Sequence, residues 1–377
     1  MGYEIGPIRP PSEARSLLLR FTRNCPWNRC HFCSLYKGTS FSVRSREELI
    51  KEIDLIKSSL EEIEKMENNG HALQVEGIHR REASGAPARN PAHAMALNWH
   101  RSGMESVFIQ DANSLVMPAA DFIGILTHLR AQFPAIQRIT CYARSHTVAG
   151  IEQADLQAMM AAGLNRLHIG METASDTVLR LVEKGTDKDT HILAGQKVKK
   201  AGIALSEYYM PGLGGREYAR ESALETADAL NQINPEFIRI RTLALQPHSR
   251  LYQDYRKGIF TRTNDVDMVQ ELQWMIEKLE GITSTVQSDH IVNLIPEVAG
   301  SLPAEKTNML EKLQWFLDLP SQEQVLFRLG RRPGVMHRAE DLQEETRRRR
   351  VRRIIEENNL TEDQLDQVTD QLMNRFI

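Results

Sequence analysis

The sequence predicts an α/β protein in which six parallel strands form an open partial barrel, a (β/α)6 arrangement, followed by a helical C-terminal extension. Apolar, strand-like runs alternate with amphipathic stretches, and this alternation is typical of a parallel sheet. From the second strand on, the repeat is roughly 30 to 40 residues, the size of a βα unit. Six units are too few for the usual closed barrel, so we expect the sheet to stay open.

The elements are predicted in a regular order along the chain. Strands begin near Ser16, Ser106, Arg138, Arg166, Ile203 and Phe237. The helices between and after them cover residues 47–66, 119–132, 151–162, 173–184 continued by 190–201, and 218–232. The strand pattern ends near residue 246, which divides the chain into a core over residues 12–245 and a mainly helical extension over residues 246–377.

Local sequence signals support these bounds. The strand runs, such as SLLLRFT, SVFIQD and RITCYA, are short and rich in residues that favour strands. Thr173 followed by Asp176 is typical of a helix N-cap and its acidic partner. Gly163, Gly185 and Gly202 fall where helices are expected to end. Residues 68–101 are polar and rich in Gly, Pro and Ala, so we expect a surface loop, with a lid as one role for it, and then a short helix over 94–101.

Side-chain alternation places polar residues on one face of most strands. A strand covered by helices on both faces is apolar on both. Here His168 lies opposite Leu167 in the alternation, and Arg239 and Arg241 lie opposite Ile240. We therefore expect helices on the outer face only and a polar cavity on the inner face.

Composition excludes several classes of protein. The net charge of −3 gives no general electrostatic case for binding nucleic acid or membranes. No apolar run approaches the roughly 20 residues that span a bilayer. The N-terminus lacks the apolar stretch of a secretory signal. We expect a protein of the reducing cytoplasm with no membrane partner.

Three cysteines follow the first strand within nine residues: Cys25, Cys30 and Cys33. Cys141 is the only other cysteine, so a disulfide framework fails and a metal or cluster site is favoured. A structural zinc site completed by His31 or Cys141 is the alternative. Three protein ligands on a four-iron cluster leave one iron open for a substrate.

The cysteine segment resembles the cluster-binding loop of the radical SAM superfamily, in which three cysteines after the first strand hold a [4Fe-4S] cluster. In that family an aromatic residue precedes the last cysteine, as Phe32 does here. The spacing C-x4-C-x2-C is one residue longer than the family's commonest C-x3-C-x2-C. The resemblance covers residues 16 to about 245 and is strongest to the branch that contains oxygen-independent coproporphyrinogen oxidase and the catalytic subunit of elongator.

The resemblance implies an enzyme whose cofactors are a [4Fe-4S] cluster and S-adenosylmethionine (SAM). An electron from reduced ferredoxin or flavodoxin would cleave SAM to a 5′-deoxyadenosyl radical that acts on an unknown substrate. The alternatives are a non-catalytic iron–sulfur or haem-handling protein on the same fold, and an RNA-modifying radical SAM enzyme.

The resemblance also implies residues that contact SAM. Asp111 and Asn113 take the place of the family's amino-group motif, although a turn after the strand is the alternative. Arg144 would bind the SAM carboxylate. Glu172 matches the ribose-binding carboxylate, with stabilisation of the next helix as the alternative. The predicted SAM-binding set is Phe32, Asp111, Asn113, Arg144, Glu172, Gly212 and Gly214.

The inner strand face supplies the candidate substrate residues, which are His168, Tyr208, Arg239 and Arg241. The two guanidinium groups need partners, either inner carboxylates or an anionic substrate. We expect a small-molecule substrate. The arginine run over residues 347–353 is interpreted as a solvated helix face, with an RNA-binding patch as the alternative.

Overall fold

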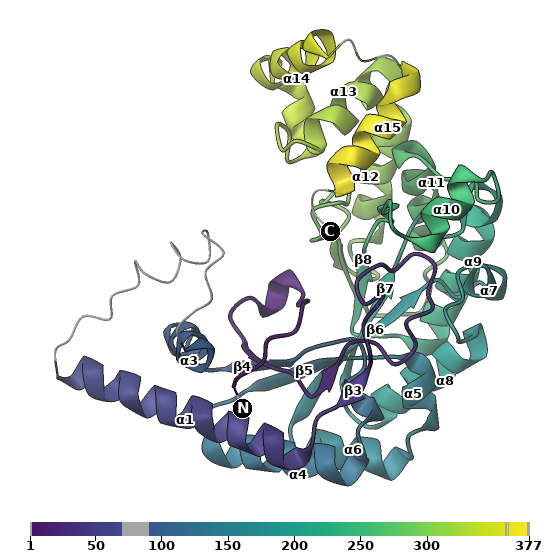
Figure 1. The fold of residues 1–377 in the computed structure, drawn as a ribbon. Helices are drawn as coiled ribbons and strands as arrows, with labels where there is room; N and C mark the ends of the chain where they lie inside the picture. Colours follow the sequence, from purple (N-terminus) through teal and green to yellow (C-terminus); the bar gives the residue numbers. More distant parts are fainter. Residues whose placement is uncertain (1, 70–89, 359, 361, 375–377) are drawn as a thin grey trace. The chain divides into compact units, whose positions relative to one another are not determined.

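The computed structural model describes residues 2–69, 90–358, 360 and 362–374 (Figure 1). The middle of the predicted loop, residues 70–89, lies outside the described residues. The short helix expected after it is present as α3 (Pro91–Arg101). No helix in the described ranges is both long and apolar enough to cross a membrane.

The strands follow the order β1-β4-β5-β6-β7-β8-β9-β10 in an open sheet. The six predicted strands correspond to β1 (Leu17–Leu19), β4 (Ser106–Ile109), β5 (Arg138–Ala143), β6 (Leu164–Glu172), β7 (Ala204–Tyr209) and β8 (Phe237–Ile240). β1 pairs with β4, β4 with β5, and β7 with β8, each in parallel. The predicted α/β fold, with an open, mostly parallel sheet and C-terminal helices, is therefore confirmed.

Two strands lie in the C-terminal extension, which the sequence predicts to be mainly helical. β9 (Thr285–Gln287) pairs with β8 in parallel, and β10 (Gly300–Ser301) pairs with β9 in antiparallel. Strands of three and two residues are too short to show an alternating pattern, so the sequence gives no signal for them.

The described chain divides into two compact units. The first comprises Met1–Pro26, Gly38–His168 and Lys197–Ala204, and the second comprises Trp27–Lys37, Ile169–Gln196 and Leu205–Ile377. The division falls within β6 and within α8 (Lys188–Lys200). It also falls within the cysteine segment, because Cys25 belongs to the first unit and Cys30 and Cys33 belong to the second.

In the first unit, β1, β4 and β5 form parallel neighbours with helices packed beside them. Helix α1 (Arg46–Asn68) begins with a capping box at Ser45 and contacts both α3 and α4 (Ala119–Gln132), as Figure 1 shows. Helices α5 (Ser145–Gly150) and α6 (Gln153–Ala161) follow β5. A small antiparallel ribbon of β2 (Thr22–Arg23) and β3 (Ser42–Val43) flanks the cysteine segment.

In the second unit, β7, β8, β9 and β10 are neighbours, and helices account for most of the rest. Helix α11 packs against α9 and α12, and α13 packs against α14 and α15. The helices are α7 (Asp176–Leu181), α9 (Gly215–Ile233), α10 (Arg250–Arg256), α11 (Asp265–Glu277), α12 (Lys306–Leu317), α13 (Ser321–Arg331), α14 (Glu345–Glu357) and α15 (Glu362–Met373).

The two sheet faces differ as the alternation predicts. In the first unit Phe108 is in register with Thr140, so the two share a face. His168 lies on the same side, since its ring is 5.6 Å from that of Tyr142, which packs edge-on to Phe108. Cys141 faces the other way and is fully buried.

Candidate functional site

The cysteine loop, defined here as residues 24–37, has no helix or strand. Its three cysteines are half-buried thiols outside any disulfide. Left-handed backbone at Asn24 (φ 69°) and Asn28 (φ 47°) turns the chain on either side of Cys25. A hydrogen bond from the Cys33 N–H to the Cys30 carbonyl oxygen, at 3.4 Å, closes the turn between the last two cysteines.

The second unit anchors the cysteine loop on residues 182–185, which we call the anchor segment. The Trp27 indole Nε1–H donates to the Glu183 carbonyl at 2.7 Å, and the His31 main-chain N–H donates to the Val182 carbonyl at 2.9 Å. A Cβ at residue 185 would overlap the Trp27 ring, and the φ of Gly185 is 70°. Glycine is therefore required at position 185 both for the backbone and for the close approach of Trp27.

The imidazole of His31 faces two carboxylates. Its Nε2 is 3.2 Å from Glu183 Oε1, and its Nδ1 is 3.6 Å from Asp254 Oδ2. Both ring nitrogens thus lie near carboxylates, so the ring does not serve as a fourth zinc ligand in this arrangement. Cys141, the other candidate, is fully buried, and burial raises the pKa of its thiol and disfavours the thiolate that zinc needs.

The donor set of the loop suits a cluster better than a bare ion. In the described ranges, no group of three or more His, Cys, Asp and Glu side chains is gathered to hold a metal ion, and this includes the three cysteines, so the fit is one of residue chemistry and number. Three thiols with no fourth protein ligand are the donors that an iron–sulfur cluster with one open iron takes. The chemistry of the residues present therefore fits the cluster.

Phe32 and Glu172 are linked through a lysine that the sequence analysis missed. The Lys184 Nζ lies 5.5 Å from the centroid of the Phe32 ring and 3.2 Å from Glu172 Oε1. Glu172 has a φ of 66°, and its carboxylate folds back over Gly170, whose position would not accept a Cβ. Lys184 is twelve residues beyond Glu172 in the sequence, and no short motif connects the two.

A second missed residue is Glu207, which lies on β7 and is 1% exposed. Burial raises the pKa of its carboxyl well above the usual range, and the charge of Glu172 raises it further. The charge of Lys184 opposes this rise. The signal that could have identified this residue is a glutamate inside the predicted strand IALSEYY.

The glycine loop, defined here as residues 211–215, follows β7, and other parts of the protein occupy the space beside its glycines. Gly212 has a φ of 94°, and a Cβ there would come within 2.8 Å of the Met268 sulfur on α11. A Cβ at Gly214 would meet the Tyr218 main chain at 3.1 Å. Packing of the loop explains both glycines, and their contact with SAM stays a prediction.

In the first unit, Asp111 supports the start of the cysteine loop. Its buried carboxylate pairs with Arg20 and accepts the Asn24 main-chain N–H at 3.3 Å. Asn24 immediately precedes Cys25, so Asp111 holds the residue from which the loop departs. This geometry gives Asp111 a positioning role, and its contact with SAM stays a prediction.

Asn113 joins the ends of two neighbouring strands. Its Nδ2 donates to Thr147 Oγ1 at 2.8 Å, and its Oδ1 accepts the Arg144 main-chain N–H at 3.3 Å. Arg144 directly precedes α5 and is half-buried. The structure therefore brings Asn113 and the Arg144 backbone together, and the contact of both residues with SAM stays a prediction.

The candidate substrate residues of the second unit share one strand face. Tyr208 is in register with Arg239, whose side chain is 5% exposed. Arg239 Nη1 donates to Asp289 Oδ2 at 2.9 Å, so this arginine has a half-exposed carboxylate as its partner. Arg241 follows on the same face, and its charge together with burial lowers the pKa of His290 to about 4, burial being the larger cause.

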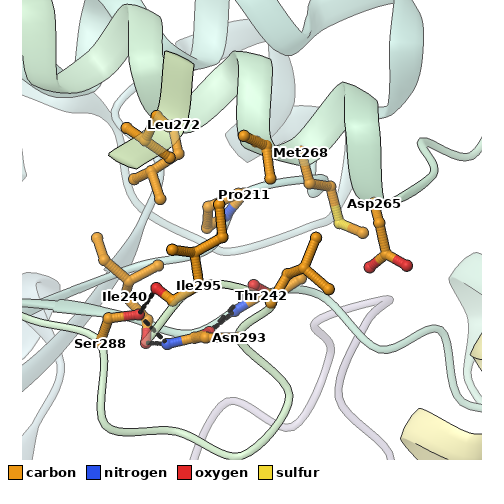
Figure 2. Close-up of a pocket in the computed structure, with 12 residues that line it drawn as sticks. Pro211, Ile240, Thr242, Asp265, Met268, Leu272, Ser288, Asn293 and Ile295 are labelled. Atoms are coloured by element: carbon orange, nitrogen blue, oxygen red, sulfur yellow. Dashed lines mark hydrogen bonds between the residues drawn. The ribbon is translucent and has the colours of Figure 1, made fainter. Parts of the chain in front are cut away.

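A pocket in the second unit lies apart from these residues (Figure 2). It is lined by the end of β8, by α11 and by residues 288–295. Asn293 forms its polar side, where Nδ2 donates to the Ile240 carbonyl at 2.8 Å and Oδ1 accepts the Thr242 N–H at 3.0 Å. Ile240 alternates with Arg239, so this pocket belongs to the helix-covered face and contains none of the predicted site residues.

Comparisons with known proteins give distant similarities. No family model matches. The chain is 26% identical over 192 residues to the tRNA-2-methylthio-N(6)-dimethylallyladenosine synthase of Lawsonia intracellularis, which is 50% of this chain and 38% of the relative. It is 20% identical over 121 residues to the tRNA uridine(34) acetyltransferase of Methanocaldococcus infernus, or 32% of this chain and 23% of the relative. The chain thus spans less than half the length of these curated relatives.

Among solved structures, the chain is similar to coproporphyrinogen III oxidase (HemN) from Escherichia coli, a radical SAM enzyme. The TM-score is 0.44 at 16% identity, with 70% of this chain and 52% of that chain covered. The resemblance predicted from the sequence thus has distant and partial counterparts among known proteins, and membership of the radical SAM superfamily remains a proposal for this chain.

Proposed function

We propose that this chain is a radical SAM enzyme in which Cys25, Cys30 and Cys33 hold a [4Fe-4S] cluster. The observation that carries the proposal is the construction of the cysteine loop. Its main chain and its Trp27 and His31 side chains are tied to the second unit, and its three cysteines are half-buried thiols. A loop held in this way offers three cysteine donors, the number that a cluster with one open iron takes.

The bound cluster and SAM would together supply reductive cleavage of SAM, with an electron from reduced ferredoxin or flavodoxin yielding methionine and a 5′-deoxyadenosyl radical that takes a hydrogen atom from the substrate. The chain's own residues bind and orient. Glu172 accepts ribose hydroxyls, Arg144 pairs with the SAM carboxylate, and Asp111 fixes the first residue of the loop.

The substrate side of the proposal rests on the face that carries Tyr208, Arg239 and Arg241. Asp289 neutralises Arg239, which leaves Arg241 as the cation of this face for an anionic group. In the described part of the second unit no carboxylate forms a salt bridge with Arg241. A small molecule that carries a carboxylate or phosphate is the substrate class that this face favours.

Anaerobic reconstitution tests the proposal. We expect wild-type protein to bind iron and sulfide, to absorb broadly in the visible range, and to release 5′-deoxyadenosine and methionine from SAM after reduction with dithionite. Cys30→Ala should lose both properties. Cys141→Ala is the matched control, because Cys141 is buried on β5, and it should keep them. Colourless wild-type protein that carries zinc would overturn the assignment.

An RNA-modifying enzyme is the second candidate, because both curated relatives are named for tRNA modification. Helix α14 exposes Arg350 and Arg353, whereas Arg348 is paired with Glu323 at 2.6 Å. Binding of unfractionated tRNA that weakens with salt, and that weakens further when Arg350 and Arg353 are both changed to Gln, would favour this candidate. Equal binding by the variant would remove it.

A further inference from the structure

Lys184 contacts the cysteine loop and the end of a strand at the same time. Its Nζ is 5.5 Å from the Phe32 ring and 3.2 Å from Glu172 Oε1. The side chains of Lys184 and Glu172 are only 11% and 12% exposed, so water screens their charges weakly. One ammonium group therefore connects the residue before Cys33 with the carboxylate expected to bind ribose.

The same ammonium faces a second carboxyl group. Glu207 is buried, and its interactions with Glu172 and Lys184 have opposite signs. Lys184 donates a hydrogen bond to Glu172 Oε1 at 3.2 Å, and this bond fixes the direction of the Glu172 carboxylate. Without the bond the carboxylate would turn more freely, and its two oxygens would no longer be held in place for the two ribose hydroxyls.

The fold of the cysteine loop does not depend on Lys184. Trp27 donates to the Glu183 carbonyl, His31 N–H donates to the Val182 carbonyl, and the Leu251 N–H donates to the His31 carbonyl at 2.9 Å. These bonds all remain when the lysine side chain is shortened or neutralised. Loss of the ammonium should thus change nucleoside binding rather than unfold the loop.

We propose that Lys184 is a positioning residue that orients the Glu172 carboxylate for the SAM ribose and holds the Phe32 ring beside it. The lysine thereby couples nucleoside binding to the cysteine loop. This inference rests on the proposed function, because it takes Glu172 as the ribose-binding carboxylate. All four side chains involved belong to the second unit.

The test is a double-mutant cycle read by binding. S-adenosylhomocysteine is the probe, since it carries the ribose of SAM and lacks the sulfonium. On reconstituted protein with a measured iron content, Lys184→Met should keep its iron and sulfide. It should raise the dissociation constant for the probe about tenfold, the scale of one charge-assisted hydrogen bond. In a Glu172→Gln background, Lys184→Met should have no further effect, because the lysine acts through Glu172.

Two further variants control the cycle. Lys188→Met is the matched control, since Lys188 is another lysine of the second unit that pairs with carboxylates, Glu225 and Asp228, and its side chain is 19% exposed. It should bind the probe like wild type. Lys184→Arg keeps a cation and should bind nearly as well, which keeps the proposal testable if the methionine variant misfolds.

The outcomes separate the two proposals. If wild type holds its cluster and binds the probe while Lys184→Met binds equally well, the role of Lys184 is wrong and the proposed function stands. If Lys184→Met loses iron together with binding, the lysine is structural and the coupling is wrong. If wild type holds no iron and does not bind the probe, both proposals fail.

Discussion

Single residues decide how the cysteine loop is held. Trp27 lies against a position where only glycine fits, and His31 places its ring between two carboxylates. On the same scale, Glu271 is a carboxyl group buried under the glycine loop, where it accepts the Gly212 N–H at 2.7 Å and the Tyr209 hydroxyl at 2.9 Å. Each of these contacts predicts the effect of one substitution.

Gly185→Ala should destabilise the second unit and lower the iron content after reconstitution. The new methyl group meets the Trp27 ring, and the φ of 70° is unfavourable for alanine. We expect a loss of about 2 to 3 kcal/mol, from backbone strain and overpacking together. Urea unfolding and iron analysis measure the two effects.

Gly258→Ala is the matched control for this substitution. Gly258 has a φ of 72°, and a Cβ there meets nothing within 4 Å. Its free energy of unfolding should fall by only about 1 kcal/mol, the cost of backbone strain alone. Equal losses in the two variants would show that the Trp27 contact contributes nothing.

Glu271→Gln should change how stability depends on pH. Burial raises the pKa of Glu271 from 4.5 to about 7, so between these values the folded state holds a proton that the unfolded state has released. Its contribution is complete below the unfolded pKa and is lost as pH rises through about 7, a difference of up to about 3 kcal/mol.

The free energy of unfolding, measured by urea between pH 4.5 and pH 8, checks this prediction. The decline with rising pH should be smaller in Glu271→Gln than in wild type. Glu277→Gln, an exposed change on the same helix, should leave the wild-type curve unaltered. Superimposable curves for wild type and Glu271→Gln would contradict the burial argument.

At the scale of secondary-structure elements, ion pairs between largely buried side chains join three helices of the second unit, α11, α13 and α15. Asp265 opens α11 and pairs with Arg328 at 3.0 Å and with Arg332, both at α13. Arg328 also pairs with Asp366 on α15. Asp265 additionally lines the pocket shown in Figure 2. Helix packing around this pocket therefore depends on one carboxylate.

Asp265→Asn should be strongly destabilising, because it leaves two buried guanidinium groups without their shared carboxylate. We expect a loss of about 3 to 5 kcal/mol in urea unfolding. Asp267→Asn, two residues along, breaks a pair with Arg216 whose side chain is 53% exposed. That control should cost about 1 kcal/mol or less. A loss at Asp265 no greater than at Asp267 would refute the argument.

At the scale of the whole molecule, the C-terminal extension completes the second unit. β9 pairs with β8, and α11 covers α9. Each of these contacts joins a segment before residue 245 to one after it, and residue 245 is where the sequence pattern changes from strands to helices. The residues beyond 245 are thus part of the same compact unit as β7 and β8.

A chain that ends after residue 245 should not fold. It would expose the faces of α9 and β8 against which Met275, Ile276 and Val286 are buried. A chain that ends after residue 358 loses only α15 and should keep a cooperative unfolding transition at lower stability. Circular dichroism and thermal unfolding distinguish the two, and a cooperative transition in the shorter chain would contradict the prediction.

Local pattern determined much of this protein. Strand and helix bounds depend on periodicity within 5 to 20 residues, so the six parallel strands and the helices between them are predictable without a structure. The cysteine loop is equally local, since its three cysteines lie within nine residues. The strands β9 and β10 are too short to carry a period, and the sequence does not reveal them.

The partners of the charged groups were decided by tertiary structure alone. Lys184 reaches Glu172 and Phe32, Asp289 reaches Arg239, and Arg328 reaches Asp265 over separations of 12 to 152 residues. No local period encodes such pairs, because they depend on which chain segments the fold brings side by side. The sequence therefore shows which chemistry the loop offers, and the fold selects the side chains that surround it.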